Sequence, residues 1–188
     1  MTVGLFGGSF DPPHKGHSLV SAKLQAALGL DVVWWLVAPQ NPLKTSSPDS
    51  MDNRLNACRE LIGSFNNRVY ISDEETRLGT RNTVDTVRKL KQIYPQVKFI
   101  WLMGADNMAS LHHWKDWQGL MHDIPVAIYP RPRYVVKAGL SPAAQQFGNY
   151  RIASDQAANL KTIDAPAWVL LTGKMDDISS TTLRNKTS

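Results

Sequence analysis

The chain has 188 residues, 43% of them hydrophobic, which is enough to bury the core of a single domain spanning residues 1–188. Its 21 Lys and Arg outnumber its 16 Asp and Glu, for a net charge of +5, but the basic residues are scattered, so we expect anionic small molecules rather than nucleic acid as partners. The single cysteine, Cys58, excludes an intrachain disulfide, and the lack of a signal-peptide pattern or a long apolar run predicts a cytoplasmic protein without membrane contact.

Apolar runs and helical patterns alternate along the chain. Strands are predicted at residues 3–6, 32–38, 69–71, 99–103, 126–129 and 168–172, and helices at residues 18–28, 52–62, 84–94 and 116–122. Near-continuous apolar strands are typical of parallel sheets that helices cover on both faces. We therefore predict a doubly wound, Rossmann-like α/β fold with a mostly parallel sheet of about six strands, whose ligands bind beyond the carboxyl ends of the strands. Residues 134–167 carry no motif.

The turn after the first predicted strand carries the most distinctive pattern, G-G-S-F-D-P-P-H-K-G-H from Gly7 to His17. It matches neither the dinucleotide fingerprint nor the Walker loop. Glycines let a phosphate approach the backbone, and the start of the following helix directs N–H groups toward an anion. Two histidines three residues apart, His14 and His17, add side-chain donors. The pattern predicts a nucleotide phosphate site, and the simpler alternative is a tight turn whose histidines cap the helix.

A second hydroxyl-rich helix start, I-S-S-T-T-L-R, lies near the C-terminus from Ile178 to Arg184. Together with the H-x-G-H turn, it resembles the signatures of the adenylyl- and cytidylyltransferase superfamily. The stretch G-A-D-N at residues 104–107 and Trp114 narrow the resemblance to the bacterial nicotinate-nucleotide adenylyltransferases, which make deamido-NAD from ATP and nicotinate mononucleotide. Rivals are the nicotinamide-mononucleotide and phosphopantetheine adenylyltransferases and, from another class, a non-catalytic nucleotide-binding module.

The resemblance implies roles for residues along the whole chain. The residues expected to act in catalysis by holding the ATP phosphates are His14, His17, Lys44 and Arg184. The other residues expected to bind ATP are Gly7, Gly8, Ser9, Phe10, Gly16, Gly104, Asp106, Ile178, Ser179, Ser180 and Thr181. The residues expected to bind the mononucleotide are Thr83, Thr86, Trp114, Lys115 and Arg131. Mg²⁺ is expected to arrive with ATP, without a protein metal site, and a homo-oligomer is compatible with the pattern.

Several of these residues also have ordinary structural explanations. Lys44 could be a solvated loop lysine, whereas the resemblance implies a phosphate contact. Asp106 could cap a helix, whereas the resemblance implies that it accepts the ribose hydroxyls of the adenosine half. Trp114 and Trp117 could pack one helical face, whereas the resemblance implies that Trp114 stacks on the cationic pyridine ring.

Two further stretches favour structural roles. The acidic stretch at residues 72–75 is expected to form a solvated turn rather than a metal site, and Asn82 or Thr83 is expected to cap the helix that follows. His112 and His113 lack an evident third ligand, so we expect them at the surface or behind the site rather than on zinc.

Overall fold

The computed structural model describes residues 1–39, 49–63 and 68–172. Its strands are β1 (Thr2–Gly8), β2 (Val32–Val37), β3 (Val69–Ser72), β4 (Lys98–Gly104), β5 (Val126–Tyr129) and β6 (Trp168–Leu170). They pair in the order β3-β2-β1-β4-β5-β6, and each neighbouring pair is parallel. The predicted α/β fold is confirmed, and the six described strands form a wholly parallel sheet where a mostly parallel one was predicted.

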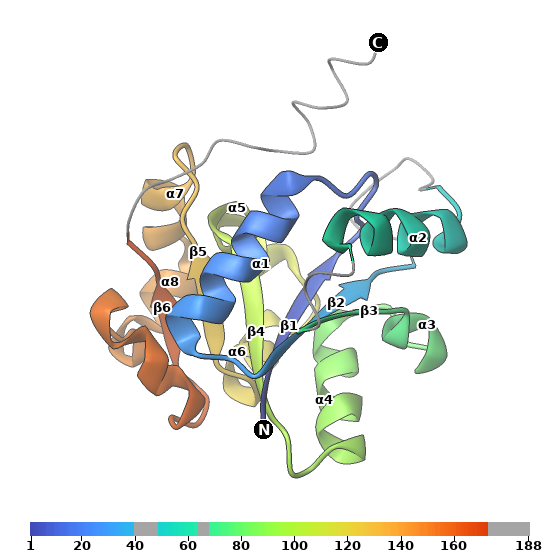
Figure 1. Ribbon diagram of the computed structural model, residues 1–188. Helices are drawn as coiled ribbons and strands as arrows, with labels where there is room; N and C mark the ends of the chain where they lie inside the picture. Colours follow the sequence, from blue (N-terminus) through green and yellow to red (C-terminus); the bar gives the residue numbers. More distant parts are fainter. Residues whose placement is uncertain (40–48, 64–67, 173–188) are drawn as a thin grey trace.

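Helices cover both faces of this sheet (Figure 1). One face carries α1 (Lys15–Leu28), α2 (Met51–Ile62) and the 3₁₀ segment η3 (Ser154–Lys161). The other carries α4 (Thr83–Ile93), α5 (Ala105–Ser110), α6 (Trp117–Asp123), α7 (Val135–Gly139) and α8 (Pro142–Gln146). The shorter segments are α3 (Glu74–Arg77), η1 (Leu111–His113) and η2 (Gly148–Tyr150). Residues 134–167, which carry no sequence motif, thus supply two helices to one face and η3 to the other.

Two hydrophobic cores lie on the two faces because alternate residues of each strand point to opposite sides. In β1, Val3 and Leu5 belong to the core under α4 and α5, whereas Phe6 belongs to the core under α1 and α2. Cys58 lies in the second core with no exposed surface, and burial raises the pKa of its thiol to about 12. Cys58 is thus a packing residue of this core.

The order of the strands reverses at the centre of the sheet. β1 pairs with β2 on one side and with β4 on the other, and the chain crosses between these two directions through α4. In doubly wound folds, such a reversal opens a crevice between the loops at the carboxyl ends of the two strands, where ligands bind. The turn after β1 and the turn after β4 therefore lie where a ligand is expected.

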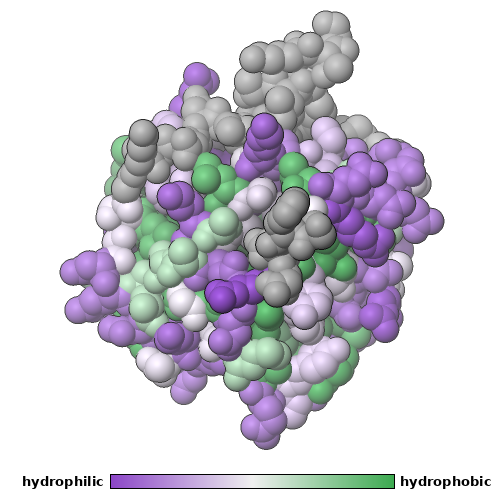
Figure 2. All heavy atoms as spheres, in the orientation of Figure 1, coloured by the Kyte–Doolittle hydropathy of each residue, from purple (hydrophilic) through white to green (hydrophobic). Residues whose placement is uncertain are grey.

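The face of the molecule drawn in Figure 2 intersperses hydrophilic and hydrophobic residues. In the described part of the chain, no helix is long and apolar enough to cross a membrane.

Candidate active site

The turn between β1 and α1 occupies residues 9–14 at the carboxyl end of the central strand. β1 continues through Gly8, so both predicted turn glycines lie in the strand instead, and α1 begins at Lys15, earlier than the predicted residue 18. A Cβ on Gly7 would lie 2.5 Å from Cη2 of Trp101. Gly7 therefore has a packing role, because the indole ring fills the space that a side chain would take.

His14 and His17 cap the N-terminus of α1 reciprocally. His14 is the N-cap residue, and its Nδ1 accepts a hydrogen bond of 3.1 Å from the N–H of Gly16. Nδ1 of His17 in turn accepts a bond of 3.2 Å from the N–H of His14, and the two rings stack with centroids 3.8 Å apart. A ring nitrogen that accepts a hydrogen bond carries no proton, so in each neutral imidazole the proton is on Nε2. The cap and a phosphate-binding role are thus compatible.

The surroundings of His14 favour the neutral form of its imidazole. Only 5% of its surface is exposed, and this burial, together with the positive charge of Arg131, lowers the pKa of its imidazole below the ordinary value of 6.5. A charged imidazolium would also lose the Nδ1 acceptor on which the cap depends. The structure therefore favours a neutral Nε2–H donor at this position.

Aromatic packing fixes the shape of the turn. Phe10 has a φ of +46°, a left-handed conformation that is uncommon for a bulky residue, and its ring stacks on Trp35 with centroids 4.8 Å apart and planes 7° apart. The His17 ring lies edge-on to Phe10 at 5.0 Å. Trp35 donates from Nε1 to Ser21 Oγ of α1 at 3.0 Å. Phe10 is 1% exposed and supports the His17 ring by packing, and its predicted contact with ATP stays a prediction.

The turn after β4 brings a carboxylate and a guanidinium together. Asp106 does not cap α5, whose N-cap residue is Gly104, so the structural alternative for this aspartate is wrong. Instead, its Oδ1 lies 3.2 Å from Nε of Arg131, which follows β5. A Cβ on Gly104 would collide with both groups in these positions, so a larger residue there would require the two side chains to shift. The positive charge of Arg131 also acts on His14, where it helps to lower the pKa of the imidazole.

Trp114 and Trp117 lie in different elements and contact different aromatic rings, so the alternative of one shared helical face is wrong. Trp114 follows η1 and lies edge-on to Trp101, with centroids 6.5 Å apart. Trp117 begins α6 and lies edge-on to Phe147. Trp114 is only partly buried and packs at the border of the core, which leaves part of its ring accessible to a ligand.

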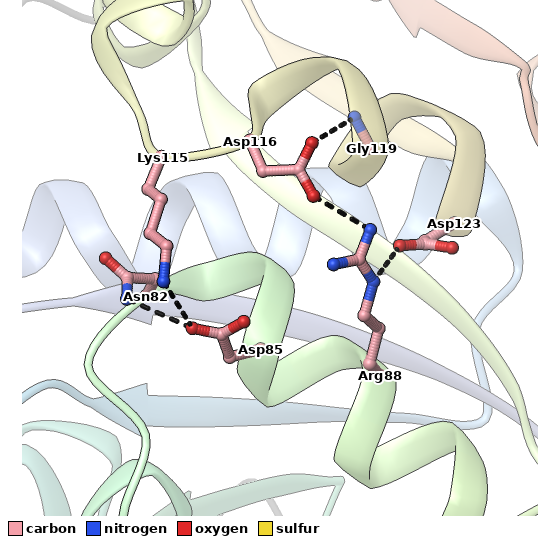
Figure 3. Close-up of polar contacts among 7 residues, drawn as sticks. All are labelled: Asn82, Asp85, Arg88, Lys115, Asp116, Gly119 and Asp123. Atoms are coloured by element: carbon pink, nitrogen blue, oxygen red, sulfur yellow. Dashed lines mark hydrogen bonds and ion pairs between the residues drawn. The ribbon is translucent and has the colours of Figure 1, made fainter.

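Ion pairs anchor the loop after Trp114 to α4, as Figure 3 shows. Lys115 Nζ lies 3.5 Å from Asp85 Oδ2, and Asp116 Oδ2 lies 2.9 Å from Nη2 of Arg88. Asp116 also caps α6 through the N–H of Gly119. Lys115, a predicted mononucleotide contact, therefore lies at the N-terminal half of α4 with an exposed ammonium group.

The loop before α4 is held by buried hydroxyl groups. Thr80 and Thr86 lie with their Oγ1 atoms 2.7 Å apart, and Oγ1 of Thr86 also donates to the carbonyl of Asn82. Thr86 has no exposed surface, so it holds this loop from beneath. Asn82 is the N-cap residue of α4, as one of the two predicted candidates, but its side chain bonds Asp85 rather than the helix backbone. Thr83, a predicted mononucleotide contact, is the first residue of α4.

The acidic stretch after β3 is not the solvated turn that was predicted. Residues 74–77 form the short helix α3, and Glu75 is 6% exposed. Burial raises the pKa of its carboxyl group from 4.5 to about 7. Composition gave no signal of this, because the burial of a charged side chain depends on which distant elements cover it.

Some predicted residues cannot be placed. Lys44, Ile178, Ser179, Ser180, Thr181 and Arg184 lie outside the described residues, so their roles stay predictions. Among residues 1–39, 49–63 and 68–172, no three His, Cys, Asp or Glu side chains gather in a way that could hold a metal ion. Of the two neighbouring histidines, His113 is exposed and His112 half-buried.

The fold and the capped histidine turn define a nucleotidyltransferase-type site. Residues 5–186 match the family model described as cytidylyltransferase-like. A probable nicotinate-nucleotide adenylyltransferase of Ruegeria sp. (strain TM1040) is 48% identical over 99% of this chain and 97% of its own length. A relative of the same description from Caulobacter sp. (strain K31) is 46% identical over 99% and 98%. The chain belongs to the nicotinate-nucleotide adenylyltransferase family within the cytidylyltransferase-like proteins.

Solved structures agree on the fold. The Plasmodium falciparum nicotinic acid mononucleotide adenylyltransferase complexed with NaAD aligns with a TM-score of 0.74 over 98% of this chain and 82% of its own, at 18% identity. The same enzyme complexed with APC aligns with a TM-score of 0.73. At this low identity, the likeness concerns the fold alone.

Replacing Glu75 by Gln should remove a pH-dependent loss of stability. The unfolded carboxyl group loses its proton near pH 4.5 and the folded one near pH 7, so the folded state binds more protons between these values and wild-type stability falls as pH rises. We expect the free energy of unfolding of Glu75→Gln, relative to wild type, to increase by on the order of 3 kcal/mol between pH 4.5 and pH 8. Urea denaturation across this range measures it. Glu60→Gln, at an exposed position on α2, is the control; a difference that stays constant with pH at Glu75 contradicts the buried, protonated carboxyl group.

Proposed function

We propose that the chain transfers the adenylyl group of ATP to nicotinate mononucleotide, forming deamido-NAD and pyrophosphate. The observation that carries this proposal is the reciprocal cap of His14 and His17, which places two Nε2 donors at a helix N-terminus, at the reversal point of the sheet. Two near full-length relatives, 46% and 48% identical and described as probable nicotinate-nucleotide adenylyltransferases, support the choice of substrates.

The reaction needs positioning more than acid–base chemistry. A phosphate oxygen of the mononucleotide forms a bond to the α-phosphorus of ATP, while the bond from that phosphorus to the bridging oxygen breaks and pyrophosphate leaves. The attacking phosphate is already ionised at neutral pH, so no general base is required. Donors that face the oxygens of the α-phosphate lower the barrier by stabilising the charge that builds up there. In the proposal, His14 and His17 donate from Nε2, and α1 adds its N-terminal N–H groups.

Side chains of neighbouring strands would bind the adenosine half and the triphosphate. Asp106 is one-third exposed, so its carboxylate can accept ribose hydroxyl groups while Arg131 holds Oδ1 in place. Arg131 also acts electrostatically on His14, and its positive charge is suited to the phosphate of the mononucleotide. Lys44, Arg184 and the hydroxyl groups of Ser179, Ser180 and Thr181 are proposed to hold the outer phosphates.

The edge formed by α4 and the Trp114 loop would bind the pyridine half. The exposed part of Trp114 can stack on the cationic ring, which contributes about 0.5–2 kcal/mol. The Asn82 side chain accepts no hydrogen bond from the N–H groups that begin α4. A carboxylate can therefore accept from these N–H groups near Thr83. Thr86 would act by shaping this loop, and exposed Lys115 adds positive charge nearby.

Mg²⁺ enters the proposal as part of the substrate. The side chains near the reversal point are mainly hydrogen-bond donors, which suit phosphate oxygens, whereas Mg²⁺ prefers oxygen ligands. This donor set fits an ion held on the triphosphate, where it neutralises phosphate charge. A single domain and a cytoplasmic location complete the proposal.

Comparing substrates tests the proposed function directly. With Mg²⁺ and ATP, we expect kcat/KM for nicotinate mononucleotide to exceed that for nicotinamide mononucleotide and for phosphopantetheine by at least about tenfold, because only the acid supplies both a cationic ring and a carboxylate. Pyrophosphate release measures turnover. A preference for either other substrate selects that rival enzyme, and no release with any of them selects the non-catalytic nucleotide-binding module.

Removing the imidazole of His17 should reduce turnover without unfolding the protein. We expect kcat of His17→Ala to fall by at least about a hundredfold, because a donor to the reacting phosphate is lost. His17→Gln separates catalysis from capping, since glutamine at this helix position can still accept from the N-cap N–H. It should retain more stability than His17→Ala and lose comparable activity.

His122→Ala, at an exposed position of α6, is the matched control and should keep kcat within about twofold of wild type. Steady-state kinetics with thermal denaturation of each variant provide the measurements. A loss of less than tenfold in both His17 variants contradicts the role of this imidazole.

A further inference from the structure

A buried arginine lies beneath two of the turns at the carboxyl edge of the sheet. Arg54, in the first turn of α2, is 3% exposed. All five of its N–H donors have acceptors: Nε bonds Asp49 O at 2.9 Å, Nη1 bonds Ser9 O at 2.8 Å and Ala38 O at 2.6 Å, and Nη2 bonds Pro39 O at 3.1 Å and lies 3.9 Å from Met51 Sδ. Within the part of the chain that the structure describes, the oxygen atoms that accept from this guanidinium are all backbone carbonyl groups.

The acceptors belong to segments that are far apart in the sequence. Ser9 begins the turn that leads to His14, whereas Ala38 and Pro39 leave β2 and Asp49 precedes α2. Ala38 N also bonds Gly8 O at 2.9 Å, so the ends of β1 and β2 are joined beside the guanidinium. Arg54 therefore ties the histidine turn to both flanks of the segment between β2 and α2.

This arrangement depends on the shape of the guanidinium and not only on its charge. Arginine presents five donors in a rigid plane, whereas lysine presents three donors at one point. A lysine at this position could reach at most three of the four carbonyl groups, and carbonyls left without a donor would shift toward other partners or water. The relative position of the two turns would then be less well fixed.

We propose that Arg54 is a positioning residue for ATP: it sets the separation between the turn that carries His14 and the flanks of the segment between β2 and α2, so that both meet the triphosphate. This inference rests on the proposed function. In it, Arg54 acts through the turns that it holds, and it affects the use of ATP but not of the mononucleotide. The mononucleotide half binds at α4 and the Trp114 loop in that proposal, away from the Arg54 contacts, and should be little affected.

Arg54→Lys tests the inference, with Arg59→Lys as the matched control. Both substitutions keep the charge and lie on α2, but Arg59 is exposed and its guanidinium donates to Asn56 on the same helix. We expect Arg54→Lys to lower kcat/KM for ATP by at least about tenfold, while KM for nicotinate mononucleotide stays within about threefold of wild type. The reason is that displacement of the turns that bind the phosphates affects the triphosphate first. Arg59→Lys should match wild type for both substrates.

The outcomes separate the two claims. If Arg59→Lys and wild type release no pyrophosphate from ATP and nicotinate mononucleotide, the proposed function fails. If they are active and Arg54→Lys loses efficiency equally for both substrates, or loses only thermal stability, Arg54 is a structural residue and the inference fails.

If Arg54→Lys does not fold, wild-type amide hydrogen exchange decides. Mg²⁺ and ATP without mononucleotide should slow exchange both in a peptide covering residues 7–16 and in one covering residues 49–58, because the guanidinium joins these segments. Slowing in the first peptide alone overturns the inference.

Discussion

The hydrogen bonds that the imidazoles of His14 and His17 accept at the start of α1 are the interaction on which the site depends. Each imidazole uses Nδ1 to accept a backbone N–H at the start of α1, so the same two bonds begin the helix, orient the rings and place a proton on each Nε2. Folding and chemistry therefore share these atoms. A strand, a turn and a helix that bury their apolar faces on the central sheet supply the rigidity that a positioning mechanism needs.

Around this cap, neighbouring groups hold the arginine side chains in place, and burial favours the neutral form of His14. Arg131 is paired with Asp106 and Arg54 with backbone carbonyls, while burial keeps His14 neutral. Groups held in this way reorganise little when a phosphate arrives, which is how preorganised donors stabilise developing charge. The order of the strands matters because it brings the turns after β1, β4 and β5 to one edge although they are far apart in the sequence.

Local signals in the sequence predicted the strands, the four longest helices and the importance of the histidine turn, because apolar runs and an ordered motif are read within a few residues. The short helices α3, α5, α7 and α8 were not predicted. The sequence could not show how Asp106 is used, since its partner Arg131 lies on another strand's turn. The burial of Glu75 and Arg54 depends on which elements cover them. The residues next to them in the sequence do not distinguish them from exposed charged residues. The sequence also could not show that the ring of Phe10 packs on Trp35, since that contact joins residues of different elements.

The tautomers of His14 and His17 test this account most directly. ¹⁵N NMR of the imidazole nitrogens at pH 7.5, in the protein without nucleotide, distinguishes Nδ1–H, Nε2–H and doubly protonated rings. The account predicts that both rings are neutral with the proton on Nε2 and that binding of an ATP analogue shifts the Nε2 signals. A proton on Nδ1 of either ring, or an imidazolium at His14, would contradict the reciprocal cap and the donor role derived from it.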